Sequence, residues 1–170
     1  MKINKTIILL ATLGVLFMIL IGKIDIGVLS KDNLEKDARK SHKIQEDWIT
    51  ASSINKDIGA FLFYDKDLSN YTFSIYTKRE GLSFGYFFRY GGALPEVSEG
   101  IDRFDYPGKG SVLLSLNKRS ISKIELGNGL EPKDVIDVDS SKPFSIIIPD
   151  NVGQIRIYDT NGELIPKKDI

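Results

Sequence analysis

The chain has 170 residues, 42% of them hydrophobic, and its 23 basic and 23 acidic residues give a formal net charge of zero. This length suits one ordinary domain plus a short extra segment, and a balanced charge lacks the basic field that draws proteins onto nucleic acid. The absence of cysteine excludes disulfides, thiolate nucleophiles and zinc–thiolate sites. With one histidine, His42, any metal site would have to consist of carboxylates, so we expect no cofactor and no nucleic-acid partner.

The N-terminal segment predicts a membrane-spanning helix. Residues 6–22 read TIILLATLGVLFMILIG and carry no charge. As a helix they would extend about 26 Å, slightly less than the ~30 Å hydrocarbon core of a bilayer. The Lys23 amine can reach the lipid surface while Ile24 and Ile26 extend the apolar length. We therefore expect an uncleaved signal-anchor over residues 6–26, with the lipid bilayer as its partner.

Two other interpretations of this segment remain open. A basic start followed by an apolar run also fits a cleaved signal peptide, although GKIDIGVLS after the run offers no small-residue cleavage site. A buried helix of a soluble fold is the second, and the run lacks the polar face that it would show. Lys2 and Lys5 favour an N-terminus inside the cell, whereas counting the basic residues after the segment, from Lys23 to Lys43, would place that side in the cytoplasm. Because a large trailing domain tends to be translocated, we expect residues 1–5 in the cytoplasm and the chain after residue 26 outside it.

Residues 27–56 predict a helical stalk. Asp32 and Glu35 have the spacing of a capping box, and no proline or glycine interrupts Ser30–Ile54. A thin apolar stripe would dock its last turns onto the following domain through Trp48 and its neighbour Ile49. The sharper alternative is a helix that binds a membrane surface or a partner protein through its basic residues Lys36, Arg39, Lys40 and Lys43.

Residues 57–168 predict a β domain. Alternating, aromatic-rich runs indicate a three-stranded meander over Ile58–Tyr64, Tyr71–Thr77 and Leu82–Tyr90. Gly91–Gly110, with two prolines, predicts a long loop around the short segment Ile101–Tyr106. Further short strands are expected at Ser111–Asn117, Ser122–Leu126, Val135–Val138, Phe144–Ile148 and Gln154–Asp159, the last joined to Glu163–Ile165 by an Asn-Gly turn. The fold class is mainly β: an antiparallel β-sandwich, or a partly closed barrel, after a transmembrane helix and a helical stalk.

One motif matches a catalytic pattern without its context. Gly81-Leu-Ser83-Phe-Gly85 has the G-x-S-x-G spacing of a hydrolase nucleophile elbow. That chemistry needs a helix after the serine and a histidine later in the chain. Here a strand-like run follows, and His42 lies upstream, so small residues facing a bulky neighbour are the better explanation.

The acidic candidates are explained better by turns and strand edges. Asp65–Asn70 begins like a calcium loop, but Asn70 and Tyr76 replace the glycine and the glutamate that the loop requires. Asp159–Glu163 fits an Asn-Gly hairpin. A local acidic cluster predicts solvated charges on an edge strand and consists of Glu131, Asp134, Asp137 and Asp139. We assign no catalytic, cofactor-binding or metal-ligating residue.

The aromatic residues between Phe61 and Tyr90 are the remaining candidates. Adjacent Phe87 and Phe88 must point to opposite faces of a regular strand, so we expect both faces of the sheet to be covered. An exposed aromatic face would instead predict ligand, glycan or partner binding. The composition and layout resemble those of small, Lys/Ile/Asn-rich envelope proteins of Gram-positive bacteria, a resemblance that assigns no residue a role.

Three functions follow from these observations. The first is a single-pass, membrane-anchored protein that displays a non-enzymatic β domain for binding or envelope structure. The second is a membrane-tethered, carboxylate-dependent hydrolase of cell-wall polymers, which a buried carboxylate pair in a cleft would support. A third is a subunit whose helix contacts an unidentified membrane partner through Gly14.

Overall fold

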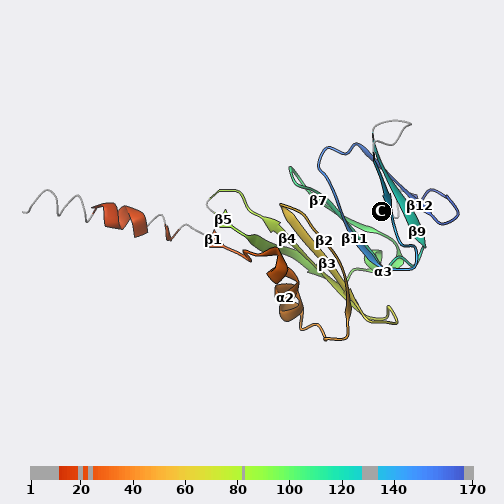
Figure 1. The fold of residues 1–170 in the computed structure, drawn as a ribbon, viewed down its shortest axis with the longest axis horizontal. Coiled ribbons are helices and arrows are strands. Elements are labelled where there is room, and N and C mark those ends of the chain that lie inside the picture. The colour runs from red at the N-terminus through yellow and green to blue at the C-terminus, as the bar shows by residue number, and fades with distance from the viewer. Residues whose placement is uncertain (1–11, 19–20, 23–24, 82, 128–133, 167–170) are drawn as a thin grey trace, which may run out of the picture.

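The computed structural model describes residues 12–18, 21–22, 25–81, 83–127 and 134–166. They form a mainly β structure (Figure 1). Besides the helical residues 12–18, it contains the helices α2 (Lys31–His42) and α3 (Pro95–Glu99). Its strands are β1 (Asp25–Ile26), β2 (Ile49–Ile54), β3 (Ile58–Tyr64), β4 (Tyr71–Lys78), β5 (Ser83–Phe84), β6 (Tyr86–Gly92), β7 (Asp102–Tyr106), β8 (Gly110–Ser115), β9 (Ile121–Gly127), β10 (Asp134–Asp137), β11 (Phe144–Ile148) and β12 (Gln154–Asp159).

The strands form three antiparallel sheets and one short parallel ladder. We call them the first sheet (β2-β3-β4-β6), the middle sheet (β11-β8-β7) and the outer sheet (β10-β9-β12); β1 pairs with β5 in parallel. Figure 1 shows α2 and the three sheets as successive layers. The antiparallel β prediction is confirmed. The alternative of a partly closed barrel is wrong, because each sheet in the described part of the chain is open and ends in edge strands.

Each interface between layers has its own hydrophobic core. In β3, Ile58, Ala60 and Leu62 face the middle sheet, while Phe61 and Phe63 face α2. In β8, Val112 and Leu114 face the first sheet and Leu113 the outer one. Every residue of both strands is therefore buried. A strand covered on both faces needs no polar side, which explains the continuous apolar runs in the sequence.

The predicted stalk is a short helix docked on the first sheet. Ser30, rather than Asp32, is the N-cap, and its hydroxyl accepts the Asp32 N–H at 3.2 Å. Leu34 and Ala38 are fully buried against the sheet. The helix ends at Lys43, which adopts a left-handed conformation.

The helical prediction is wrong for β2, which is a strand of the first sheet. The apolar stripe of α2 packs against the first sheet instead of facing solvent along a free stalk. Arg39, one of the candidate surface-binding residues, donates to the carbonyl of Trp48 at 3.0 Å and to the Thr50 hydroxyl at 2.6 Å. It also forms an ion pair with Glu35 at 2.9 Å. Arg39 therefore fastens the helix to the start of β2.

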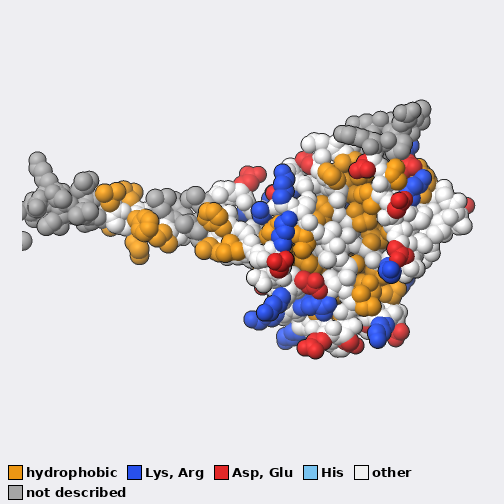
Figure 2. Space-filling view, in the orientation of Figure 1, with side chains coloured by type: hydrophobic (Ala, Val, Ile, Leu, Met, Phe, Trp, Pro, Cys, Tyr) orange, Lys and Arg blue, Asp and Glu red, His pale blue; other side chains and the backbone are white. Residues whose placement is uncertain are grey.

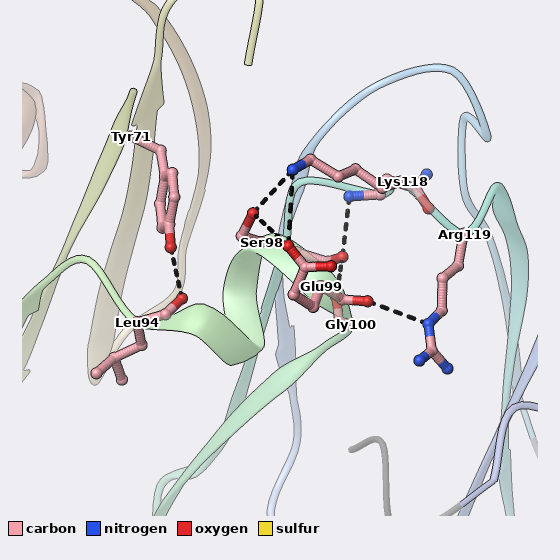
Figure 3. Close-up of polar contacts among 9 residues, drawn as sticks. Tyr71, Leu94, Ser98, Glu99, Gly100, Lys118 and Arg119 are labelled. Atoms are coloured by element: carbon pink, nitrogen blue, oxygen red, sulfur yellow. Dashed lines mark hydrogen bonds and ion pairs between the residues drawn. The ribbon is translucent and has the colours of Figure 1, made fainter. Parts of the chain in front are cut away.

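The predicted loop over Gly91–Gly110 contains a helix that was not predicted, α3, and its short segment Ile101–Tyr106 contains strand β7. α3 carries the chain from β6 in the first sheet to β7 in the middle sheet. The Tyr71 hydroxyl donates to the Leu94 carbonyl at 2.7 Å, and Lys118 donates to the Ser98 hydroxyl at 2.9 Å (Figure 3). The Arg119 Nε donates to the Glu99 carbonyl at 3.1 Å, so polar contacts hold this crossing on both sides.

The predicted strand over Leu82–Tyr90 is divided at Gly85. Gly27 and Gly85 lie where the segment before α2 crosses the β5–β6 junction. A Cβ at Gly27 would lie 2.3 Å from the Tyr86 carbonyl oxygen, and one at Gly85 would lie 2.6 Å from the Val28 carbonyl oxygen. Gly85 also has a positive φ of 86°. Glycine is required on both segments because only its lack of a side chain allows this approach.

The predicted signal-anchor over residues 6–26 lies partly outside the described residues, as do residues 1–5 entirely. Residues 12–18 are helical, and their side chains are exposed. Within the described residues, no helix has the length and apolarity needed to cross a membrane. Among the described residues, no atom outside its own helix lies within 4 Å of the position that a Cβ on Gly14 would take.

Candidate functional site

The edges of two stacked sheets meet along β6 and β7. β6 is the last strand of the first sheet and β7 the last strand of the middle sheet. Across this edge, the ring centroids of Tyr90 and Phe104 are 5.3 Å apart, and those of Phe73 and Phe104 are 5.1 Å apart. Tyr90 is 45% exposed. The expectation that both faces of this strand are covered holds for Phe87, which is 9% exposed, and is wrong for Phe88, which is 49% exposed. Aromatic surface therefore remains open at this edge.

A bulge in β6 places Arg89 at the same edge. Ile75 of β4 pairs with Tyr90 and Tyr76 with Phe88, so Arg89 is the extra residue between them. Its Nε donates to the Thr77 hydroxyl at 2.9 Å. Within the described residues, no partner is found for its two terminal nitrogens. The guanidinium is therefore oriented by one bond and keeps the donors that recognise carboxylates and phosphates.

Beside Arg89 lies a hollow of about 270 Å³, lined by Thr77, Arg89, Tyr106, Pro107 and Lys109. Lys109, from the turn between β7 and β8, donates to the Lys78 carbonyl and retains two further N–H donors. None of the five lining residues is acidic. We call this hollow, together with the exposed ring of Tyr90, the edge site.

Tyr106 contributes a neutral donor to the edge site. Burial raises the pKa of its hydroxyl to about 12, and the Arg89 charge opposes the rise. The phenol is therefore protonated at physiological pH. The hollow therefore combines the Arg89 guanidinium, the Lys109 ammonium and the Tyr106 hydroxyl. These donors suit an anionic group, either phosphate or carboxylate. The aromatic rings can contact a flat or apolar part of the same ligand.

A second hollow, of about 240 Å³, lies on the other side of the β7–β8 turn. It contains Arg103, Asp105, Ser111 and Asp150. Here the charges pair with one another: Arg103 Nε donates to Asp105 at 2.8 Å, and the Ser111 hydroxyl donates to the same carboxylate oxygen. Hydrogen bonds from Ser111 and Arg103 outweigh burial and lower the pKa of Asp105. Because these side chains bond to one another, the second hollow has fewer free donors for a ligand than the edge site has.

The structure explains the G-x-S-x-G match without catalysis. Ser83 lies in β5, and Gly85 leads into β6 rather than into a helix. The glycine serves the crossing with the segment before α2. His42, at the end of α2, packs its ring 6.1 Å from Phe88. The motif therefore lacks the structural context of a nucleophile elbow.

The two acidic loops are turns, as expected. Asp65 accepts the N–H groups of Ser69 at 2.8 Å and Asn70 at 3.1 Å. Asp159 accepts those of Asn161 and Glu163, both at 2.8 Å. Each carboxylate is thus used to close a loop.

The predicted acidic cluster is spread along an edge. Asp134 and Asp137 lie on β10, an edge strand of the outer sheet, while Asp139 pairs with Lys142 at 2.7 Å. Glu131 lies outside the described residues. Among the residues that are described, no three His, Asp or Glu side chains lie together in a way that could hold a metal ion.

Sequence reasoning missed both cations of the edge site. Lys109 belongs to no ligand-binding motif, because its neighbours Pro107, Gly108 and Gly110 lack the spacing of a phosphate loop. Arg89 was the one charged residue in the run Tyr86–Tyr90. A charge within an otherwise aromatic strand was the available signal, but the bulge that turns it toward the hollow has no sequence signature.

Comparison with known proteins gives no relative. The chain matches no protein-family model, and neither the curated proteins nor the solved structures include a match. The function must therefore be argued from the chain itself.

Proposed function

We propose that the protein is a single-pass, membrane-anchored binding protein whose β domain lies outside the cytoplasm and takes an anionic ligand at the edge site. The observation that carries the binding proposal is Arg89, oriented by Thr77 while its terminal nitrogens remain without a partner in the described structure. An arginine held in this way loses little further freedom when it binds an anion.

The membrane anchor is supported by the sequence. Residues 6–22 contain no charge and are nearly long enough to cross a bilayer. The large C-terminal part favours translocation, and the absence of cysteine is compatible with any redox compartment. An anionic polymer of the cell envelope is the class of ligand that such a domain would meet and that its edge site would suit.

A hydrolase receives less support. Glycosidic chemistry needs a proton-donating carboxyl, whose pKa is raised, near a second carboxylate in one cleft. The edge site has no acidic lining residue. In the second hollow, the pKa of Asp105 is lowered rather than raised. Neither hollow combines the two groups that the reaction requires.

Topology and binding need separate tests. Alkaline extraction of membranes from cells that produce the full chain should leave the protein in the membrane fraction, and protease added to intact cells should degrade the β domain. Release of the chain shortened by about 25 residues, the length of a cleaved signal peptide, would contradict the anchor.

Binding is tested with the full chain in neutral detergent micelles. Calorimetric titration with a polyphosphate probe should give saturable binding that weakens as salt rises, while neutral dextran should give none. Arg89→Ala should weaken binding tenfold or more. Lys118→Ala is the matched control, because Lys118 is also exposed but lies beside α3. Equal binding by both variants would contradict the edge site.

A further inference from the structure

The short ladder of β1 and β5 carries an exposed apolar surface. Ile26 and Phe84 are direct partners in its register. Their exposed fractions are 64% and 54%, and Leu29, three residues further along, is 67% exposed. We call these three side chains the apolar face. Isolated exposed hydrophobic residues are common, but a paired set beside a long hydrophobic segment is a feature of surfaces that meet lipid.

The apolar face is fixed to the domain. The Gly27 N–H donates to the Phe84 carbonyl at 2.8 Å, and Val28 and Tyr86 exchange two backbone hydrogen bonds of 2.9 Å. The Arg79 guanidinium lies 4.1 Å from the centre of the Phe87 ring and pairs with Asp25. Residues 25–28 thus form part of the folded domain rather than a free linker.

The hydrophobic segment ends close to this face. Only three peptide units separate Gly22 from Asp25, and they span at most about 10 Å. Figure 1 shows β1 beside β5 at one end of the domain, and Figure 2 shows hydrophobic side chains at the same end. If residues 6–22 cross a bilayer, the apolar face lies within reach of its interfacial layer.

Resting on the anchor of the proposed function, we propose that the apolar face inserts into the interfacial layer of the same bilayer and holds the β domain against the membrane. The occupant is phospholipid. Recognition is mainly apolar, because Asp25 and Glu80 balance the neighbouring Lys78 and Arg79. Lys109 of the edge site binds the Lys78 carbonyl, so docking also places that hollow beside the headgroups rather than far above them.

Phe84 is the decisive position, because Ile26 would be near lipid through its closeness to the anchor alone. Phe84 is 62 residues beyond Gly22 in the sequence and comes near the membrane only while the β1–β5 ladder holds it beside Ile26 and the apolar face meets lipid. Trp48 is the only tryptophan. The full chain with Trp48→Phe and Phe84→Trp therefore reports the lipid contact of position 84. The control carries Trp48→Phe and Leu164→Trp, because Leu164 is similarly exposed, at 56%, but pairs with Tyr158 of the outer sheet.

Both proteins are reconstituted into vesicles of phosphatidylcholine with brominated acyl chains, and tryptophan quenching is measured. We expect quenching at position 84 to exceed that at position 164 several-fold, and Ile26→Ser with Leu29→Ser to reduce it toward the control. Equal quenching at both positions, in chains that float with the vesicles, would overturn docking and leave the anchor intact. Chains that fail to float would overturn the anchor and docking together.

Trp48 is partly buried against α2, so its replacement can disturb folding. A second pair of proteins keeps Trp48 and uses the absence of cysteine. Phe84→Cys and Leu164→Cys each carry a single nitroxide label, and power saturation compares access to oxygen and to a water-soluble nickel chelate. Greater oxygen access at position 84 supports docking, and equal aqueous access at both positions overturns it.

Discussion

β7 runs between two groups of basic residues that are used differently. At its start, beside α3, Lys118 donates to Ser98, and Arg119 donates to the Glu99 carbonyl (Figure 3). At its end, Arg89 and Lys109 each make one contact with the protein beside a hollow without acidic residues. Net charge does not separate the two groups. What separates them is the presence of a counter-ion: the Glu99 carboxylate lies 4.0 Å from the Lys118 amine, whereas no acidic residue lines the hollow beside Arg89 and Lys109. This comparison distinguishes a structural polar cluster from a candidate binding site.

The largest expected effect is on binding at the end of β7. Arg89→Ala should weaken polyphosphate binding tenfold or more, since a hydrogen bond to a charged group contributes about 1.5–3 kcal/mol. The midpoint of urea unfolding should fall modestly, because the Thr77 hydroxyl is buried and loses one hydrogen-bond partner. Calorimetry and urea titration of the same samples measure the two quantities. An Arg89→Ala variant that unfolds more easily but binds polyphosphate normally would show that Arg89 has a structural role rather than a binding role.

At the start of β7, the expected effect is on stability. The Ser115 hydroxyl donates to the Gly100 carbonyl and accepts the buried Asn117 N–H at 2.9 Å. Ser115→Ala leaves both groups unsatisfied and should lower the free energy of unfolding by about 1–3 kcal/mol. Polyphosphate affinity, measured under conditions where the variant is folded, should match that of the parent chain. A selective loss of affinity would instead connect this cluster to binding.

Tyr71→Phe tests the same region with a smaller change. It removes only the bond from the Tyr71 hydroxyl to the Leu94 carbonyl and keeps the ring. The expected loss is about 1 kcal/mol in the free energy of unfolding, read from urea titration. No change would mean that water replaces the hydroxyl at this end of the sandwich.

The smallest expected effect concerns Asp102, the first residue of β7. Burial raises the pKa of its carboxyl, and the nearby Glu96 charge adds to the rise. A raised pKa means that ionisation costs the folded state more than the unfolded one, so the penalty develops as pH rises from about 4, the ordinary value, through the folded value. Asp102→Asn should therefore stabilise the protein by about 0.5 kcal/mol or less at neutral pH.

The pH dependence supplies the control for this prediction. The advantage of Asp102→Asn should shrink below about pH 4, where the parent carboxyl is protonated in both states. Thermal unfolding of both proteins across this range measures the difference. An advantage that grows as pH falls would show that the charge stabilises the strand.

The sequence predicts the β part of this fold well, because its signal is local. Ile58–Tyr64 is a strand with the predicted bounds, and the Asn-Gly hairpin after β12 is present. Prediction fails where tertiary packing decides. Ile49–Ile54 lacks glycine and proline and continues a helical stripe, yet β3 recruits it as an edge strand.

The candidate site illustrates the same limit. Arg89 and Lys109 are 20 residues apart, and only the stacking of the first and middle sheets brings them to one hollow. α3 was missed for a related reason: five residues are too few for a helical period, and Val97 is buried only because the chain crosses between two sheets there. Residues that come together only because two sheets stack have no characteristic spacing in the sequence, so no sequence pattern predicts their contact.

The crossing of β1 over the β5–β6 junction also has a mechanical meaning. Any pulling force that enters through the N-terminal segment reaches residues 25–28 first. Their few backbone hydrogen bonds, to Phe84 and Tyr86, are the first to bear the load, before α2 and the first sheet. Such a short ladder can detach and lengthen the tether by several residues while the three stacked sheets stay folded. Residues 25–28 would then detach under load and extend the connection between the domain and whatever holds its N-terminus.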